Sequence, residues 1–262
     1  MPIVELIVPG TWIDHPDRDL GFRIESQLRW FEQLFYDANT ALNLFEESCS
    51  RLNSTLTIES ILKEHEEDSD RRQKIQNGIK HLQEENPTFQ DRREEMFLVN
   101  IMVKREKWSE GHTPTVFERR ARIIYAKAFI YALDGFSKHL DALAKMVKTP
   151  DIEKIRTKMI DAFPDLNEVR NTAHHTEDRS RGIGKKSKEM DLKPFDNGYV
   201  HSEGGSLYFE ILSGSKFGTT MGDGNFGEVD ISLNSLLALQ EIFHDVIALF
   251  SWTGPKQHFP SK

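Results

Sequence analysis

The sequence predicts a mainly α-helical protein: a helical bundle with a small antiparallel β-meander inserted before its last helix. Three observations lead to this prediction. Apolar residues recur at three- and four-residue steps through most of the first two thirds of the chain, and again near its C-terminus. Short segments of strand-like composition alternate with glycine-containing turns between residues 206 and 232. The 17 phenylalanines and 4 tryptophans among 262 residues are enough to build a core.

Five helices are expected before residue 165, separated by turns that contain proline or glycine. The apolar stripe between Val116 and Met146 is the longest, so the helix that carries it is expected to be the most buried. Asp134-Gly135 interrupts this stripe, where a glycine would let another helix cross closely. The predicted segments are residues 20–52, 57–85, 89–108, 116–146 and 152–163.

The rest of the chain is predicted to contain short strands and one more helix. The last helix begins near Ser232 or Asn234, either of which can cap it. We expect residues 1–262 to form a single domain, with residues 183–232 as an inserted basic loop and β-meander. The predicted strands are residues 3–8, 207–212, 216–221 and 226–232.

Composition and charge narrow the possible functions. The net charge of −8 disfavours a general affinity for nucleic acid or an anionic membrane, so a nucleic-acid site must be a local basic patch. The single cysteine, Cys49, excludes an internal disulfide and a cysteine-rich zinc site, and it fits a reducing cytoplasm. No apolar run approaches the ~20 residues of a membrane span, and residues 1–10 are too short and too acidic for a signal peptide. We therefore expect a cytoplasmic protein.

One stretch concentrates side chains that are capable of chemistry. Residues 170–175 read Arg-Asn-Thr-Ala-His-His and lie near the end of a helical pattern. The fixed fork of donors on an arginine holds and neutralises a phosphate, and a histidine moves protons near neutral pH. Cysteine or carboxylate ligands do not accompany them in the sequence, so the pattern favours phosphate chemistry without a metal ion or other cofactor.

Helix geometry limits how these side chains can meet. On an ideal helix Arg170 and His174 lie only ~40° apart, whereas Arg170 and His175 lie ~140° apart. His175 would share a site with Arg170 only if the helix loosens there, or if a symmetry-related copy closes the site. The alternative is an ordinary polar helix end, where arginine and histidine interact favourably with the helix dipole.

The motif opens a locally basic segment on an acidic chain. Between Arg170 and Lys193 there are seven Lys or Arg and four Asp or Glu, an excess of three positive charges. We therefore expect any bound RNA to lie along this segment, held by contacts to its phosphates. The predicted RNA-binding residues are Arg179, Arg181, Lys185, Lys186 and Lys188.

The pattern Arg170-Asn171-x-x-x-His175, on a late helix of a predicted bundle, resembles the HEPN superfamily. Active members of that superfamily carry Arg-x4–6-His, very often as Arg-Asn-x-x-x-His. The resemblance covers the bundle, about residues 20–252, although only the six-residue motif is specific, and the long first half and the inserted meander depart from the minimal family bundle. It implies metal-independent RNA cleavage in a cleft between the two subunits of a homodimer. It also implies a toxin or antiviral role, with an antitoxin or nucleotidyltransferase as partner.

The resemblance assigns a role to each motif residue. Arg170 would hold the scissile phosphate, and His175 would act as general acid or base on the 2′-hydroxyl or the leaving 5′-oxygen. Asn171 would orient one of them, and His174 would be accessory. Two other functions stay open: a non-catalytic module that dimerises or docks a partner protein or nucleic acid, and a structural protein whose motif is accidental. The intact motif favours the enzyme, whereas the acidic charge balance favours the module.

Overall fold

The structure of the chain is a computed structural model, whose described ranges are residues 2–55, 57–85, 92–198 and 201–261. It divides into two compact units. The larger unit consists of Met1–Glu46 with Ile123–Lys262, and the smaller unit consists of Glu47–Arg122. The single domain expected over residues 1–262 stays a prediction. The segment that forms the smaller unit is strongly polar, and its two main helices pack on each other.

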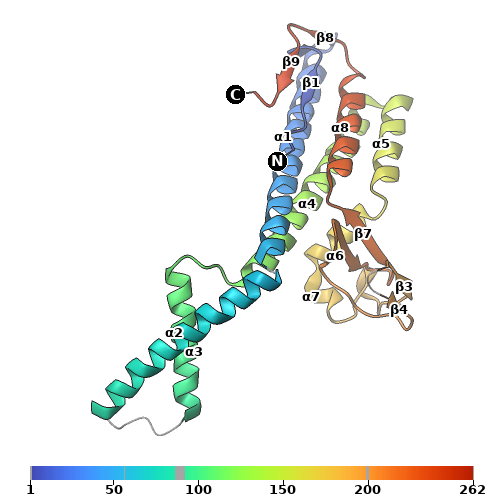
Figure 1. Ribbon diagram of the computed structural model, residues 1–262. Coiled ribbons are helices and arrows are strands. Elements are labelled where there is room, and N and C mark those ends of the chain that lie inside the picture. The colour runs from blue at the N-terminus through green and yellow to red at the C-terminus, as the bar shows by residue number, and fades with distance from the viewer. Residues whose placement is uncertain (1, 56, 86–91, 199–200, 262) are drawn as a thin grey trace. The chain divides into compact units, whose positions relative to one another are not determined.

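The larger unit contains α1 (Arg18–Thr55), α4 (Thr115–Val147), α5 (Pro150–Ala162), α6 (Leu166–His174), α7 (Thr176–Arg179) and α8 (Leu233–Ile247), of which α1 and α4 extend beyond it. Figure 1 shows α8 between α1 and α5. Phe31 of α1 and Phe136 of α4 are fully buried and meet edge to face, with ring centroids 4.5 Å apart. The prediction of a mainly helical bundle is therefore confirmed.

Close packing of α1 on α4 follows from the sequence of α4. A Cβ atom on Gly135 would lie 2.8 Å from Leu34 Cδ2, so glycine permits the close crossing that the sequence predicts. The buried face of α4 begins at Ile123 rather than at the start of the apolar stripe. Val116 and Phe117 are 60% and 64% exposed, because they precede the part of α4 that belongs to the larger unit.

The predicted β-meander is present. Strands β5 (Ile211–Ser213), β6 (Lys216–Thr220) and β7 (Phe226–Asp230) form an antiparallel sheet in that order. Gly224 turns the chain between β6 and β7 with a φ of +89°, which glycine adopts without steric cost. A further hairpin, β3 (Phe195–Asp196) with β4 (His201–Ser202), precedes it.

The two ends of the chain pair with each other. Strand β1 (Leu6–Val8), predicted within residues 3–8, pairs with β9 (Gln257–Phe259) in antiparallel register. Strand β2 (Trp12–Ile13) likewise pairs with β8 (Trp252–Thr253). The sequence predicts only a polar C-terminal tail. It does not predict these pairings, because the partner strands lie more than two hundred residues apart in the chain.

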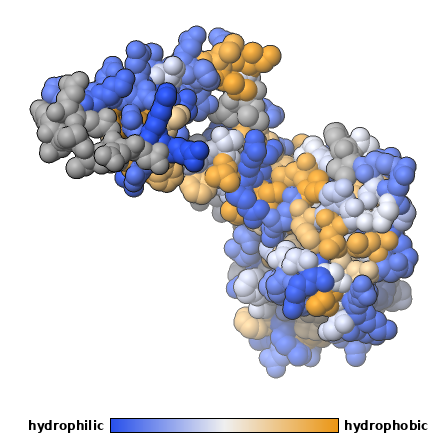
Figure 2. All heavy atoms as spheres, turned by 90° about the horizontal axis from the view of Figure 1, so that it is seen from below, coloured by the Kyte–Doolittle hydropathy of each residue, from blue (hydrophilic) through white to orange (hydrophobic). Residues whose placement is uncertain are grey.

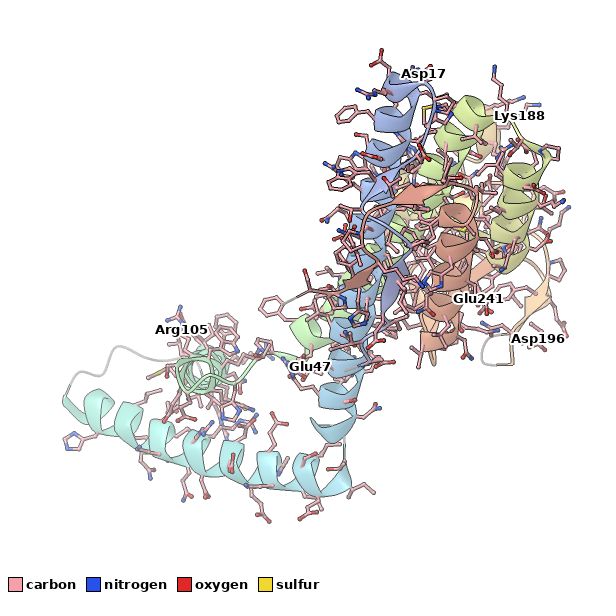
Figure 3. All side chains as sticks on the ribbon, turned by 90° about the horizontal axis from the view of Figure 1, so that it is seen from above. Asp17, Glu47, Arg105, Lys188, Asp196 and Glu241 are labelled. Atoms are coloured by element: carbon pink, nitrogen blue, oxygen red, sulfur yellow. The ribbon has the colours of Figure 1, made fainter. Side chains whose placement is uncertain are left out.

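The smaller unit contains α2 (Ile58–Glu85) and α3 (Arg92–Ser109), which run antiparallel. Ion pairs link the first half of α2 to the last turn of α3 and the residue after it: Lys107 with Glu64 at 2.5 Å, and Arg71 with Glu110 at 2.6 Å. Figure 3 looks along α3 and shows Arg105 directed away from α2. Residues 89–91 of the predicted third helix lie outside the described residues.

The surface is mixed in polarity. Figure 2 shows hydrophobic patches that interrupt the hydrophilic surface of both units. In the larger unit Phe22 and Trp30 contribute apolar surface, and in the smaller unit Phe97 and Trp108 do so. None of the helices, over their described residues, combines the length and the apolar character that crossing a membrane requires.

Candidate functional site

Helix α6 carries the motif and is fixed by its apolar side. Its buried residues are Leu166, Val169, Thr172 and Ala173. The helix packs against β6 and β7. Just before its first turn, the carboxylate of Asp165 accepts a hydrogen bond from the backbone N–H of Glu228 in β7, at 3.1 Å. The motif helix is thereby attached to the inserted sheet.

Arg170 reaches from α6 to the central helix α4. Its Nε donates to Asp134 Oδ2 at 2.7 Å. The same oxygen accepts a hydrogen bond from Lys138 Nζ at 2.6 Å, one helical turn further along α4. The Asp134 side chain is 8% exposed, that of Arg170 22% and that of Lys138 51%. A buried carboxylate therefore holds Arg170 from the inside, while Lys138 approaches from the solvent side.

The electrostatics of Asp134 follow from this placement. Burial raises the pKa of its carboxyl group, and the charge and hydrogen bond of Arg170 oppose that rise without cancelling it. Aspartates buried in an apolar helix are uncommon unless they have a partner. Asp134 is therefore placed where it positions a cation.

Asn171 completes the immediate surroundings of the guanidinium. Arg170 Nη1 donates to Asn171 Oδ1 at 2.9 Å, and Asn171 Nδ2 lies 3.5 Å from Asn167 Oδ1. With Nε and Nη1 occupied, Arg170 Nη2 has no hydrogen-bond partner among the described residues. One face of the guanidinium fork is thus available to a ligand.

The two histidines lie where the helix ends. Helix α6 stops at His174, and His175 has a φ of −113° and a ψ of 44°, so the helix does loosen at this point. The two imidazole rings meet edge to face with centroids 5.0 Å apart. His175 Nδ1 lies 3.7 Å from Glu177 Oε1, and its side chain is 49% exposed. In the described part of the chain no hydrogen bond joins either histidine to Arg170.

Arg179, predicted to bind RNA, is instead part of the interior. It is 8% exposed, and its Nη1 donates to the carbonyl oxygen of Ile183 at 2.6 Å. Its guanidinium also packs against Gly222, where a Cβ atom would lie 2.9 Å from Nη2. This arginine holds the loop after α7 against the β-meander, so little of its side chain is exposed to an RNA.

The other predicted RNA-binding residues are exposed, but two of them are paired. Arg181 Nη2 lies 2.6 Å from Asp178 Oδ1, and Lys185 Nζ lies 3.0 Å from Glu168 Oε1. Lys186 and Lys188 form no ion pair with any described residue. Figure 3 shows Lys188 at the edge of the larger unit. The basic segment is therefore less positive at its surface than its sequence indicates.

Asp134 is the positioning residue that sequence reasoning missed. Asp134 was apparent only as a tolerated interruption of an apolar stripe. Its signal is nevertheless there, because a charged residue on the buried face of a long helix needs a partner. The partner, Arg170, lies 36 residues further along the chain, so it becomes visible only in the fold.

No group of three His, Cys, Asp or Glu residues is placed to hold a metal ion in the part of the chain that the structure describes. Comparison of the chain with protein-family models, curated proteins and solved structures gives no match. The chemistry of the motif must therefore be judged from its own geometry.

Proposed function

We propose that this protein is a metal-independent endoribonuclease of the HEPN type that acts as a homodimer. The observation that carries the proposal is the state of Arg170. It is anchored by a buried carboxylate and an adjacent amide, with one terminal nitrogen left open, on the helix that the half-exposed His175 follows. A guanidinium fixed in this way is pre-organised to bind a phosphate.

Arg170 would stabilise the charge that develops on the scissile phosphate. Its open Nη2 would donate to a non-bridging oxygen, while Asp134 holds Nε and so sets the direction of the fork. Asp134 is a positioning residue in this scheme, because it acts through Arg170. Asn171 would orient Arg170 by accepting the hydrogen bond from Nη1.

His175 would transfer the proton. As a base it would remove the proton of the 2′-hydroxyl, whose oxygen attacks the phosphate, and as an acid it would protonate the leaving 5′-oxygen. One histidine serves one of these steps at a time, so a two-fold axis that brings two copies of the motif together would supply both. His174 contacts the ring of His175 and would assist by fixing its orientation.

RNA would approach along the segment after the motif. Lys186 and Lys188 lack ion-pair partners among the described residues. Arg181 could exchange the exposed carboxylate of Asp178 for a phosphate at little cost, and Lys185 could exchange the partly buried carboxylate of Glu168. Binding should weaken with added salt, since contacts to phosphates release counterions. Charge reversal at Lys186 and Lys188 should weaken RNA affinity, and unchanged affinity would contradict this placement.

The proposal is tested by incubating the purified protein with labelled RNA in EDTA. We expect cleavage that leaves 2′,3′-cyclic phosphate ends. His175→Ala should lower the rate roughly 10²–10⁴-fold, and His201→Ala serves as the matched control, since this histidine is also exposed but lies outside the motif. Cleavage that survives in His175→Ala and disappears in EDTA would show that the mechanism is wrong.

A second function, a non-catalytic dimerisation or docking module, is favoured by one observation. Arg170 already has an anionic partner, and most of the predicted basic segment is paired or buried. Sedimentation at tens of micromolar separates the possibilities when it is combined with the cleavage assay. A dimer that cleaves no RNA supports the module, whereas a strict monomer argues against the composite site.

A further inference from the structure

A cavity of about 390 Å³ lies in the larger unit between the N-terminal half of α1, helix α8 and the paired terminal strands, which Figure 1 shows side by side. Its volume is within the range of small-molecule sites. Aromatic side chains supply much of its wall: Trp12, Trp252, Phe243 and Phe259. It contains none of the motif residues and is not used in the proposed cleavage of RNA.

Three charged side chains of α1 line the same cavity on successive turns: Glu25, Arg29 and Glu32. Glu25 Oε1 accepts the backbone N–H of Ile13 at 2.8 Å, and Glu32 Oε1 accepts the hydroxyl of Tyr36 at 3.0 Å. These bonds fix both carboxylates and leave the second oxygen of each without a partner in the described ranges.

Arg29 stands between these glutamates at spacings of four and three residues, at which arginine and glutamate ordinarily pair. It nevertheless makes no ion pair or hydrogen bond with any residue that the structure describes. The cavity therefore offers a set of unused donors beside unused, fixed acceptors, with aromatic surface around them.

We infer that this cavity binds a guanine base. Guanine presents two acceptors, O6 and N7, on one edge, and a guanidinium such as that of Arg29 donates to both. Its neighbouring edge presents the N1–H and N2–H donors, which suit a carboxylate oxygen of Glu25 or Glu32. The ring stacks on aromatic walls, and Trp12, which is 57% exposed, stands at the opening.

The same chemistry discriminates against the other bases. Adenine carries an amino group where guanine carries O6, so it would set a donor against the donors of Arg29. Pyrimidines lack the N7 acceptor. Two carboxylates and one guanidinium give the cavity a net negative charge, so the sugar and any phosphates of the ligand would remain outside, in solvent.

The test is titration of the full-length protein with guanosine, followed by isothermal titration calorimetry and by tryptophan fluorescence. Trp12 and Trp252 line the cavity and report on its occupancy. We expect saturable binding of guanosine that is at least tenfold tighter than that of adenosine or cytidine. Neither readout depends on RNA cleavage, so the result stands apart from that of the nuclease assay.

Substitutions on α1 test whether guanosine binds in this cavity. Arg29→Ala should weaken guanosine binding about 5–150-fold, the range for one bidentate base contact. Arg23→Ala is the matched control, since Arg23 is exposed on the same helix outside the cavity, and it should bind as the wild type does. Glu25→Gln with Glu32→Gln retains acceptors for Ile13 and Tyr36, and it should reduce the preference for guanosine over inosine, which lacks the N2 amino group.

Each of three results would overturn the inference. The first is that a protein with a normal circular dichroism spectrum shows no saturable binding of guanosine up to the solubility limit of guanosine. The second is equal affinity for adenosine and guanosine, and the third is unchanged guanosine affinity in Arg29→Ala.

Discussion

Replacing Arg170 with lysine tests whether the anchored guanidinium, rather than a positive charge alone, is what the motif requires. In the structure one side chain meets Asp134 through Nε and Asn171 through Nη1, and it keeps Nη2 open. Lysine carries a single ammonium group. That group can bond the buried carboxylate or reach toward a phosphate, but it cannot do both in this geometry.

The expected loss of cleavage rate can be estimated from the hydrogen bond between Arg170 and the phosphate that disappears. Removal of one donor that stabilises a developing oxyanion costs about 2.7–4 kcal/mol, or about 10²–10³-fold in rate. We therefore expect Arg170→Lys to lose nearly as much activity as Arg170→Ala. The assay is single-turnover cleavage of a labelled RNA in EDTA, with circular dichroism to confirm that each variant is folded.

Lys138→Ala is the matched control for this experiment. Lys138 bonds the same oxygen of Asp134, but its side chain is 51% exposed and it pairs at an i,i+4 spacing, which contributes only about 0.3–0.5 kcal/mol. Its removal should change the cleavage rate less than about threefold. If Arg170→Lys kept more than about a tenth of the wild-type rate, charge alone would suffice and the reasoning from the fork would be refuted.

Three further predictions concern stability. Burial raises the pKa of the Asp134 carboxyl, so the folded state binds this proton more tightly than the unfolded chain. Stability should therefore increase as the pH falls through the raised folded-state pKa, and urea unfolding of Asp134→Asn over a pH series should lack that slope. Gly224→Ala should prevent closure of the β6–β7 turn, because the new Cβ would lie 1.9 Å from the carbonyl oxygen of Asp191 and the residue has a positive φ. We expect the variant to yield little soluble, folded protein, as measured by circular dichroism. Phe136→Ala should lower the free energy of unfolding by about 3–5 kcal/mol, against less than about 1 kcal/mol for the exposed Phe22→Ala, as measured by urea denaturation.

Local pattern determined the elements of this fold. The helical steps of α1, α4 and α8 and the glycine turn before β7 depend on interactions between residues at most a few positions apart, and these can be recognised in one sequence. The motif helix belongs to the same class, although its exact end at His174 came from the structure. For these elements the sequence alone was sufficient.

Contacts between distant segments decided which polar side chains are buried and which residues pair with each other. Nothing in the sequence around Arg179 distinguishes it from Arg181, yet the first is buried against Gly222 and the second is exposed. Pairing of Arg170 with Asp134 likewise depends on which face of α4 meets α6. Such choices are made by packing across the whole larger unit, where the summed burial of many side chains outweighs any single local preference.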